Sequence, residues 1–230
     1  MTAHQFTRWV LKPVTFVACL GPAVYLVWAL FTGNLSANPL SDVTNETGVW
    51  TLRFLCLTLA MTPLRRLSGW NGAIRFRRMV GLYAFFYGTL HLMTYVILDR
   101  FAGLDFSDGL SLGTIMSWKT ARGLAMAVAA DIYKRPFIMI GSLAFVSMVP
   151  LAATSTAGMI RRLGGRRWQA LHRLVYVSAI AGVTHYWWLV KADVARPQRY
   201  AIVVGVLLLL RVYWARLKRT SKADLRGSQS

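Results

Sequence analysis

Long runs of apolar residues, separated by short polar and basic segments, dominate the chain from residue 13 to residue 214. A helix needs about 20 mostly apolar residues to cross the roughly 30 Å of hydrocarbon in a bilayer. Six runs approach that length, and each predicts a transmembrane helix. They cover residues 13–31, 48–64, 79–98, 137–160, 168–190 and 200–214. The pattern therefore predicts an all-α membrane protein built as a six-helix transmembrane bundle.

Some of these segments carry features that change the expected helix. Pro22 predicts a kink in the first helix, because proline has no backbone N–H to donate. Arg53 lies close enough to the end of the second run for its side chain to reach the interface. The sixth run is short, and Arg211 interrupts it. Segment 123–130 is apolar but too short to span, so it predicts an interfacial or re-entrant piece of the connection between the third and fourth helices.

Composition and charge support a membrane location. The chain is 56% hydrophobic and 15% charged, whereas roughly a quarter of an average soluble domain is charged. A net charge of +19 would indicate a nucleic-acid partner on a soluble protein. Here most basic residues gather on one side of the predicted bundle. We expect them to contact membrane lipid and no nucleic acid. The positive-inside rule then predicts cytoplasmic termini.

The predicted organisation is one domain followed by a short polar segment. We expect residues 1–219 to form a single transmembrane domain. Residues 220–230 are polar and lie at the chain end, which predicts a disordered cytoplasmic tail.

Candidate chemistry rests on histidine, because Cys19 and Cys56 lie inside apolar runs and form no Cys-x-x-Cys pair. His91 and His185 lie on the third and fifth predicted helices. At 1.5 Å per residue they are about 12 and 9 Å from the outer helix ends, and so at nearly the same depth. Two such imidazoles suit the axial ligands of a b-type haem held between the two helices. The structural alternative is a neutral histidine that bonds across helices.

His172 belongs to a different level of the bundle, about 20 Å from His185. A second haem there would meet His172 on one helix and Arg77 or Arg78 on the other. Arginine is a poor axial ligand but binds haem propionates and flavin phosphates well. Three roles for His172 stay open at this point: ligand of a second haem, contact to a flavin, quinone or propionate, and structural side chain.

An ordered set of segments resembles a known family. The segments are 62–66 (TPLRR), 77–87 (RRMVGLYAFFY) leading to His91, 171–176 (LHRLVY) leading to His185, and 188–191 (WLVK). They closely resemble the MsrQ family, which belongs with the ferric-reductase-like transmembrane haem proteins. The resemblance implies a bacterial inner-membrane protein that holds haem b, as one haem or two, through His91, His172 and His185. It also implies FMN as a further cofactor.

The same resemblance implies a function in electron transfer. A member of this family is a non-catalytic subunit that passes electrons from the quinone pool or a cytosolic flavin reductase to MsrP. That periplasmic molybdopterin partner reduces methionine sulfoxide in oxidised proteins. Because the chain ends soon after the sixth run, we expect a separate electron donor. Acidic residues of the connection 99–122, Asp105 and Asp108 among them, have two interpretations, a docking surface for the partner or a solvated loop.

The competing interpretation is a solute or metal permease whose histidines line a pathway. Carboxylates are missing from the six runs, and no pair of Gly- or Pro-broken helices stands out as an inverted repeat. The sequence therefore favours electron transfer over transport.

Overall fold

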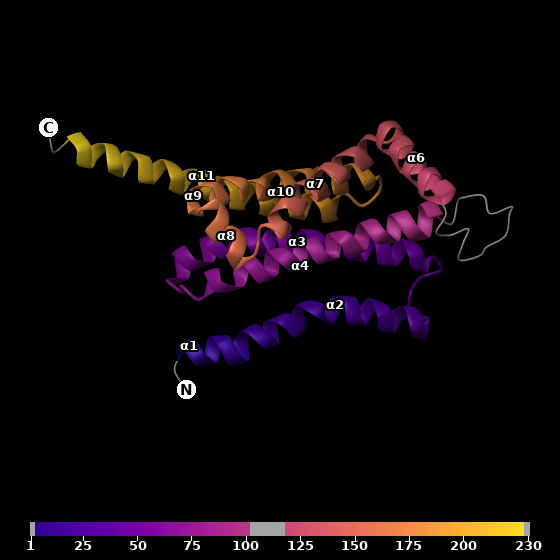
Figure 1. Cartoon of the computed structure of the whole chain (residues 1–230), viewed down its shortest axis with the longest axis horizontal. Helices are drawn as coiled ribbons and strands as arrows, with labels where there is room; N and C mark the ends of the chain where they lie inside the picture. Colours follow the sequence, from indigo (N-terminus) through magenta and orange to yellow (C-terminus); the bar gives the residue numbers. More distant parts are fainter. Residues whose placement is uncertain (1–2, 102–117, 228–230) are drawn as a thin grey trace.

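The structure, a computed structural model, describes residues 3–101 and 118–227, and these residues are helical almost throughout (Figure 1). Two short segments, η1 and η2, have π-helical hydrogen bonding. In chain order the elements are α1 (Ala3–Phe6), η1 (Thr7–Leu11), α2 (Lys12–Thr32), α3 (Pro39–Ser68), α4 (Ala73–Met93), η2 (Thr94–Phe101), α6 (Trp118–Lys134), α7 (Pro136–Ala153), α8 (Ala157–Leu163), α9 (Gly165–Leu171), α10 (Leu174–Leu189) and α11 (Ala195–Gly227).

Five helical segments of the described residues are long and apolar enough to cross a membrane. They are Thr7–Thr32, Pro39–Ser68, Ala73–Ile97, Pro136–Ala153 and Ala195–Leu217. Helix α10 takes the place of the fifth predicted span, but its 16 residues rise only about 24 Å. The predicted all-α membrane class is confirmed, whereas the crossing by α10 stays a prediction.

The fourth and fifth helices are shorter than the hydropathy pattern predicts. Helix α7 ends at Ala153, and the Thr154 hydroxyl then donates to the Pro150 carbonyl at 2.6 Å. Thr156 begins α8 by accepting from the Met159 N–H at 3.2 Å. Gly164, with φ of 75°, separates α8 from α9. These local bonds turn the chain across one end of the bundle, where Figure 1 shows α8 and α9.

Two antiparallel helix pairs form the centre of the bundle. Helix α3 packs along α4, and α7 packs along α10. Their facing sides bury the core, in which Leu59, Tyr87 and Ala179 are fully buried. The outer helices α2 and α11 instead expose large apolar side chains, such as Phe31 and Leu209. Exposed apolar faces of this extent suit contact with lipid.

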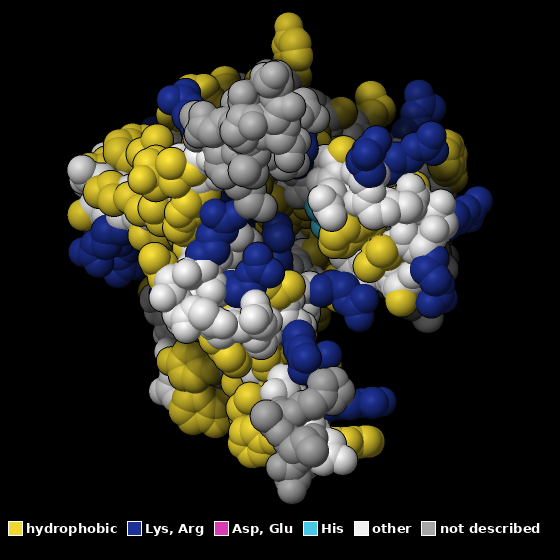
Figure 2. All heavy atoms as spheres, turned by 90° about the vertical axis from the view of Figure 1, so that its left-hand side faces the viewer, with side chains coloured by type: hydrophobic (Ala, Val, Ile, Leu, Met, Phe, Trp, Pro, Cys, Tyr) yellow, Lys and Arg dark blue, Asp and Glu magenta, His cyan; other side chains and the backbone are white. Residues whose placement is uncertain are grey.

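The end of the bundle that holds the chain termini is rich in basic side chains. Both chain termini lie at one end, and α6 lies at the other (Figure 1). Figure 2 shows the end with the termini, where many Lys and Arg side chains are spread over the surface. Among the described residues, no Asp or Glu side chain is visible on this face. This end of the bundle is therefore basic, as the sequence predicts.

Helix α3 begins nine residues before the apolar run that predicts it, which places Arg53 inside the helix and not near its end. Helix α3 begins at Pro39, where Asn38 caps it by accepting from the Ser41 N–H at 3.1 Å. Arg53 is consequently near the middle of the helix. Its Nε donates to the Tyr200 hydroxyl at 3.3 Å, and its guanidinium lies 4.3 Å from the Trp50 ring centre. Arg53 thus contacts one aromatic side chain on its own helix and one on α11, and its reach to the interface stays a prediction.

Arg211 does not interrupt the last helix, because neighbouring helices satisfy most of its guanidinium. Nη1 donates to the Tyr176 hydroxyl at 2.7 Å, and Nη2 donates to the Leu59 carbonyl at 2.8 Å. Helix α11 therefore continues through Arg211 and on to Gly227, into the segment for which the sequence predicts a tail. Segment 123–130 lies within α6, which is helical throughout its length.

Tyr87 completes the helix turn that Pro22 disturbs in α2. The Ala23 N–H donates to the Tyr87 hydroxyl at 3.0 Å, and that hydroxyl donates to the Cys19 carbonyl at 2.9 Å. In an uninterrupted helix the Ala23 N–H would donate directly to the Cys19 carbonyl. The hydroxyl is thus inserted into the hydrogen-bond ladder next to a proline, a recognised cause of helix bending. It also ties α2 to α4.

Tyr87→Phe is expected to destabilise the protein by about 1–3 kcal/mol, because buried backbone groups lose their partner. Tyr83→Phe is the matched control, since the Tyr83 hydroxyl also reaches α2, donating to the Phe16 carbonyl at 2.8 Å, but bridges no pair of groups. Unfolding of both purified variants in the same detergent measures the difference. Equal losses in the two variants would contradict the bridging role.

Candidate functional site

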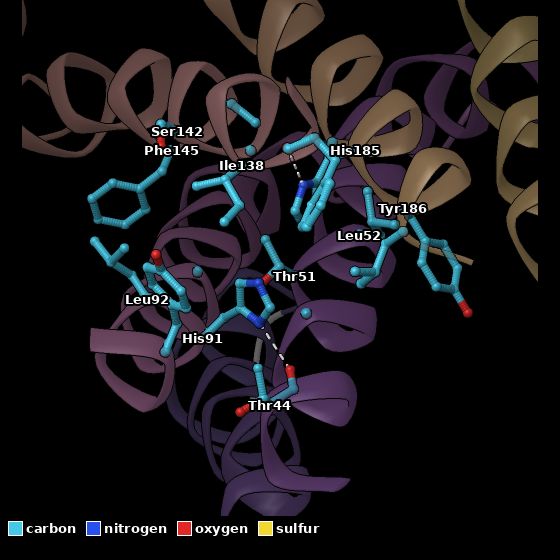
Figure 3. A pocket seen from close by; sticks show the side chains of 18 of the residues that line it. Thr44, Thr51, Leu52, His91, Leu92, Ile138, Ser142, Phe145, His185 and Tyr186 are labelled. Atoms are coloured by element: carbon cyan, nitrogen blue, oxygen red, sulfur yellow. Dashed lines mark hydrogen bonds between the residues drawn. The ribbon is translucent and has the colours of Figure 1, made fainter. Parts of the chain in front are cut away.

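A cavity of about 520 Å³ lies between α3, α4, α6, α7 and α10. Its volume is within the roughly 300–1,000 Å³ range of ligand pockets. Most of the lining is apolar, with Leu52, Leu92, Ile138 and Phe145 among the side chains in Figure 3. A few polar groups, including two histidines, interrupt that lining. The cavity thus has the composition of a site for a large apolar ligand with specific polar contacts.

His91 and His185 meet in this cavity. His91 projects from α4 and His185 from α10, and Figure 3 shows them on opposite sides of the cavity. Their ring centres lie 6.1 Å apart, with 75° between the ring planes. The structure therefore brings together the two side chains that the sequence places at one depth.

Each of these imidazoles is held by a backbone carbonyl. Nδ1 of His91 lies 2.8 Å from the Thr44 carbonyl oxygen, and Nδ1 of His185 lies 2.6 Å from that of Phe137. A carbonyl oxygen can only accept, so Nδ1 is the donor in both bonds. In the neutral ring the lone pair is then on Nε2. Both histidines are therefore prepared to bind a metal through Nε2.

The donor set fits a metal that brings most of its own ligands. Among the described residues, no group of three or more His, Cys, Asp and Glu side chains lies together. A metal–imidazole bond is about 2 Å long, so two rings that bind one ion from opposite sides have centres about 6 Å apart. The observed separation of 6.1 Å agrees with this spacing. A porphyrin iron with two axial imidazoles meets these conditions.

Arg135 is a cavity residue that was not predicted from the sequence. Of the described lining residues it alone is charged. Its Nε lies 3.6 Å from an Asp131 carboxylate oxygen, and Tyr95 donates to the other oxygen at 2.6 Å. A guanidinium fixed in this way suits a carboxylate on a ligand in the cavity. Asp105 and Asp108, named above as docking candidates, lie outside the described residues.

His172 lies near the opposite end of α7 and bonds differently. The Thr154 hydroxyl donates its proton to the Pro150 carbonyl at 2.6 Å, so it accepts from Nε2 of His172 at 3.2 Å. The proton is therefore on Nε2, which leaves the lone pair of the neutral ring on Nδ1. Trp168 covers the ring, with centres 3.9 Å apart. Burial, and to a smaller extent the charge of Arg77, lowers the pKa of His172.

The structure separates the two candidate arginines. Arg77 is half-buried and close enough to His172 and Arg211 for their charges to interact. Arg78 is exposed. The second candidate site thus comprises His172, Arg77 and Arg211. Arg211 was not predicted as a member of this site, because its contacts depend on the register of α11, which the apolar pattern does not determine.

Known proteins place the chain in a class and then in a family. Residues 25–183 match the family model described as "Ferric reductase like transmembrane component". The chain is therefore a ferric-reductase-like transmembrane protein, the class that its helices and paired histidines define. Relatives that are 46–51% identical over most of the chain carry the name MsrQ. The chain therefore belongs, within that class, to the MsrQ family, which confirms the resemblance found in the sequence.

The relatives that show this membership are similar over most of their length. Each is named "Protein-methionine-sulfoxide reductase heme-binding subunit MsrQ". The protein from Herminiimonas arsenicoxydans is 47% identical over 95% of this chain and 91% of its own length. That from Ralstonia nicotianae is 51% identical over 86% and 83%. That from Rhodospirillum rubrum is 46% identical over 90% and 89%. No solved structure matches the chain.

Proposed function

We propose that this protein is the haem-binding membrane subunit of a methionine sulfoxide reductase system and transfers electrons through haem b. The observation that carries the proposal is the pair His91 and His185, which meet across an apolar cavity with Nδ1 of each on a carbonyl. The names of the relatives support it, since all three proteins are described as haem-binding subunits. A permease is not favoured, because these relatives are subunits of a reductase.

The residues of the cavity have distinct tasks in this proposal. When bound, haem b supplies one-electron transfer at a potential that its surroundings adjust. His91 and His185 would hold the iron, and Arg135 would hold an acidic group of the ligand. The carbonyls of Thr44 and Phe137 fix the ring orientation and increase the basicity of Nε2. The apolar lining keeps water away from the site.

The proposed topology has six crossings, with α10 as the fifth. Helix α10 runs antiparallel to α7, since His172 meets Thr154 near one end and His185 meets Phe137 near the other. It therefore covers the same depth as α7, which is long and apolar enough to span. The basic end with both termini would face the cytoplasm of a bacterial inner membrane.

The two sites divide electron entry from electron exit in this topology. The cavity with His91 and His185 is near the outer end, where the periplasmic partner MsrP would accept electrons. The inner site, with His172, Arg77 and Arg211, would receive them from a quinone or a cytosolic flavin reductase. Its guanidinium groups suit the phosphate of FMN or the propionates of a second haem. Arg78 is exposed and stays outside this site.

The haem content of the purified protein tests the proposal. We expect protein from haem-replete cells to contain at least one b-type haem per chain, with a low-spin spectrum that changes on reduction by dithionite. The pyridine haemochrome assay with amino-acid analysis gives the stoichiometry. A second haem per chain would assign the inner site to haem, and a cofactor-free preparation would overturn the proposal.

A further inference from the structure

A glycine lies directly behind each imidazole of the outer cavity. A Cβ placed on Gly141 would be 2.7 Å from Nδ1 and 2.9 Å from Cε1 of His185. A Cβ placed on Gly48 would be 3.1 Å from both Nδ1 and Cε1 of His91. Contacts below about 3 Å require atoms to move, since carbon pairs are most stable at about 3.5–4.0 Å. Both rings therefore occupy space that any other residue would fill.

The two glycines share one position relative to the carbonyls that hold the rings. Gly48 follows Thr44 by four residues, and Gly141 follows Phe137 by four residues. In an α-helix the carbonyl of residue i points toward the N–H of residue i+4. The Cβ of residue i+4 tilts toward the helix N-terminus and so lies beside that carbonyl oxygen. A side chain there would obstruct an imidazole that approaches the oxygen from outside the helix.

We infer that Gly48 and Gly141 are positioning residues for the two haem ligands. Each opens one carbonyl of a neighbouring helix to an imidazole, which fixes the proton on Nδ1 and the rotation of the ring. Nε2 then stays available to the cavity. The inference rests on the proposed function, because it concerns the geometry of histidines that bind haem iron. The same arrangement occurs twice, on α3 for His91 and on α7 for His185.

The alternative is that the glycines only allow helices to pack closely, as small residues do in membranes. Gly88 and Gly182 show that role, because a Cβ on either would meet the flexible end of an apolar side chain, Met148 or Leu52, at 3.0 Å, and other glycines have more room. A Cβ on Gly81 would meet Thr58 at an ordinary 3.6 Å, and a Cβ on Gly205 would meet nothing within 4 Å. Gly48 and Gly141 differ because their neighbour is a ring held in place by a hydrogen bond.

The distances predict graded effects of alanine. In Gly141→Ala the His185 ring has to move away from the new methyl group, which breaks or lengthens its bond to the Phe137 carbonyl. In Gly48→Ala the shorter displacement of His91 leaves a weakened bond to the Thr44 carbonyl. Gly81→Ala and Gly205→Ala are the matched controls, because they add the same methyl group to membrane helices at positions with room for it.

The test compares these four glycine variants with His91→Ala and His185→Ala in purified protein. The readouts are haem per chain, the electron paramagnetic resonance spectrum of oxidised haem, which responds to the orientation of the two imidazole planes, and the midpoint potential. We expect Gly141→Ala to lose the wild-type low-spin signal and Gly48→Ala to shift it with a smaller change in potential. The two control variants should match the wild type.

The outcomes separate this inference from the proposed function. Wild-type signals and potentials in both Gly48→Ala and Gly141→Ala would overturn the inference, and so would equal haem loss in all four glycine variants. If His91→Ala and His185→Ala keep the wild-type haem signal, the two histidines are not the haem ligands, whereas wild-type protein without any haem would overturn the proposed function itself. Size-exclusion chromatography checks folding. If Gly141→Ala does not yield folded protein, the low-spin signal and potential of the milder variant, Gly48→Ala, test the inference.

Discussion

Replacing either His91 or His185 by alanine is expected to abolish the low-spin haem spectrum of the outer site. The two rings lie 6.1 Å apart across one cavity, and each offers a single Nε2 lone pair to it. With one ring removed, only the other histidine would hold the haem in this apolar site. Since changes to groups behind metal ligands already cost roughly 10–100-fold in affinity, loss of a ligand should lower the haem affinity at least about tenfold.

Optical spectra and haem per chain in the purified variants measure this loss. His172→Ala is the matched control, because it removes a histidine from the other end of the bundle and should leave the outer haem in place. A wild-type low-spin spectrum in either His91→Ala or His185→Ala would refute the pairing. Loss of the outer haem in all three variants would indicate a general folding defect.

The pairing of the two histidines could be predicted from helix geometry alone. Both helices run in the same direction, and charged residues near their outer ends, Asp99 and Lys191, gave reference points for counting 1.5 Å per residue. What holds the rings could not be predicted in this way. The Thr44 and Phe137 carbonyls belong to the backbone of other helices, and their approach depends on the rotation and register of α3 and α7.

Helix ends were the least predictable part of the fold, for a related reason. Hydropathy marks the apolar part of a helix, whereas caps and local hydrogen bonds decide where it begins and ends. The polar start of α3 depends on the Asn38 cap, and the end of α7 depends on Thr154. Arg53 and Arg211 show the same limit, since their tyrosine partners on other helices are far away in the sequence.

Replacing Arg77 by glutamine is expected to slow electron entry from the donor at the inner site. Arg77 is half-buried beside Arg211 and His172, and among the described residues neither arginine forms an ion pair with a carboxylate. Two neighbouring guanidinium groups favour an anionic group of a cofactor or donor. A charge-assisted hydrogen bond contributes about 1.5–3 kcal/mol, so its loss should weaken that contact roughly 10–100-fold.

Stopped-flow reduction of the outer haem, by a flavin reductase with its nicotinamide or by a quinol, measures this effect. Arg78→Gln is the matched control, because it removes the same charge one residue away, from an exposed side chain. If both variants slow haem reduction equally, a general attraction between the basic end and the donor explains the rate, and the proposed role of Arg77 is wrong.

His172→Ala should also slow reduction of the outer haem by the donor. Once reduced by dithionite, His172→Ala and Arg77→Gln should both still deliver electrons to the periplasmic partner. Loss of the outer haem from either variant, in protein that still folds by size-exclusion chromatography, would show that entry and exit do not use separate sites.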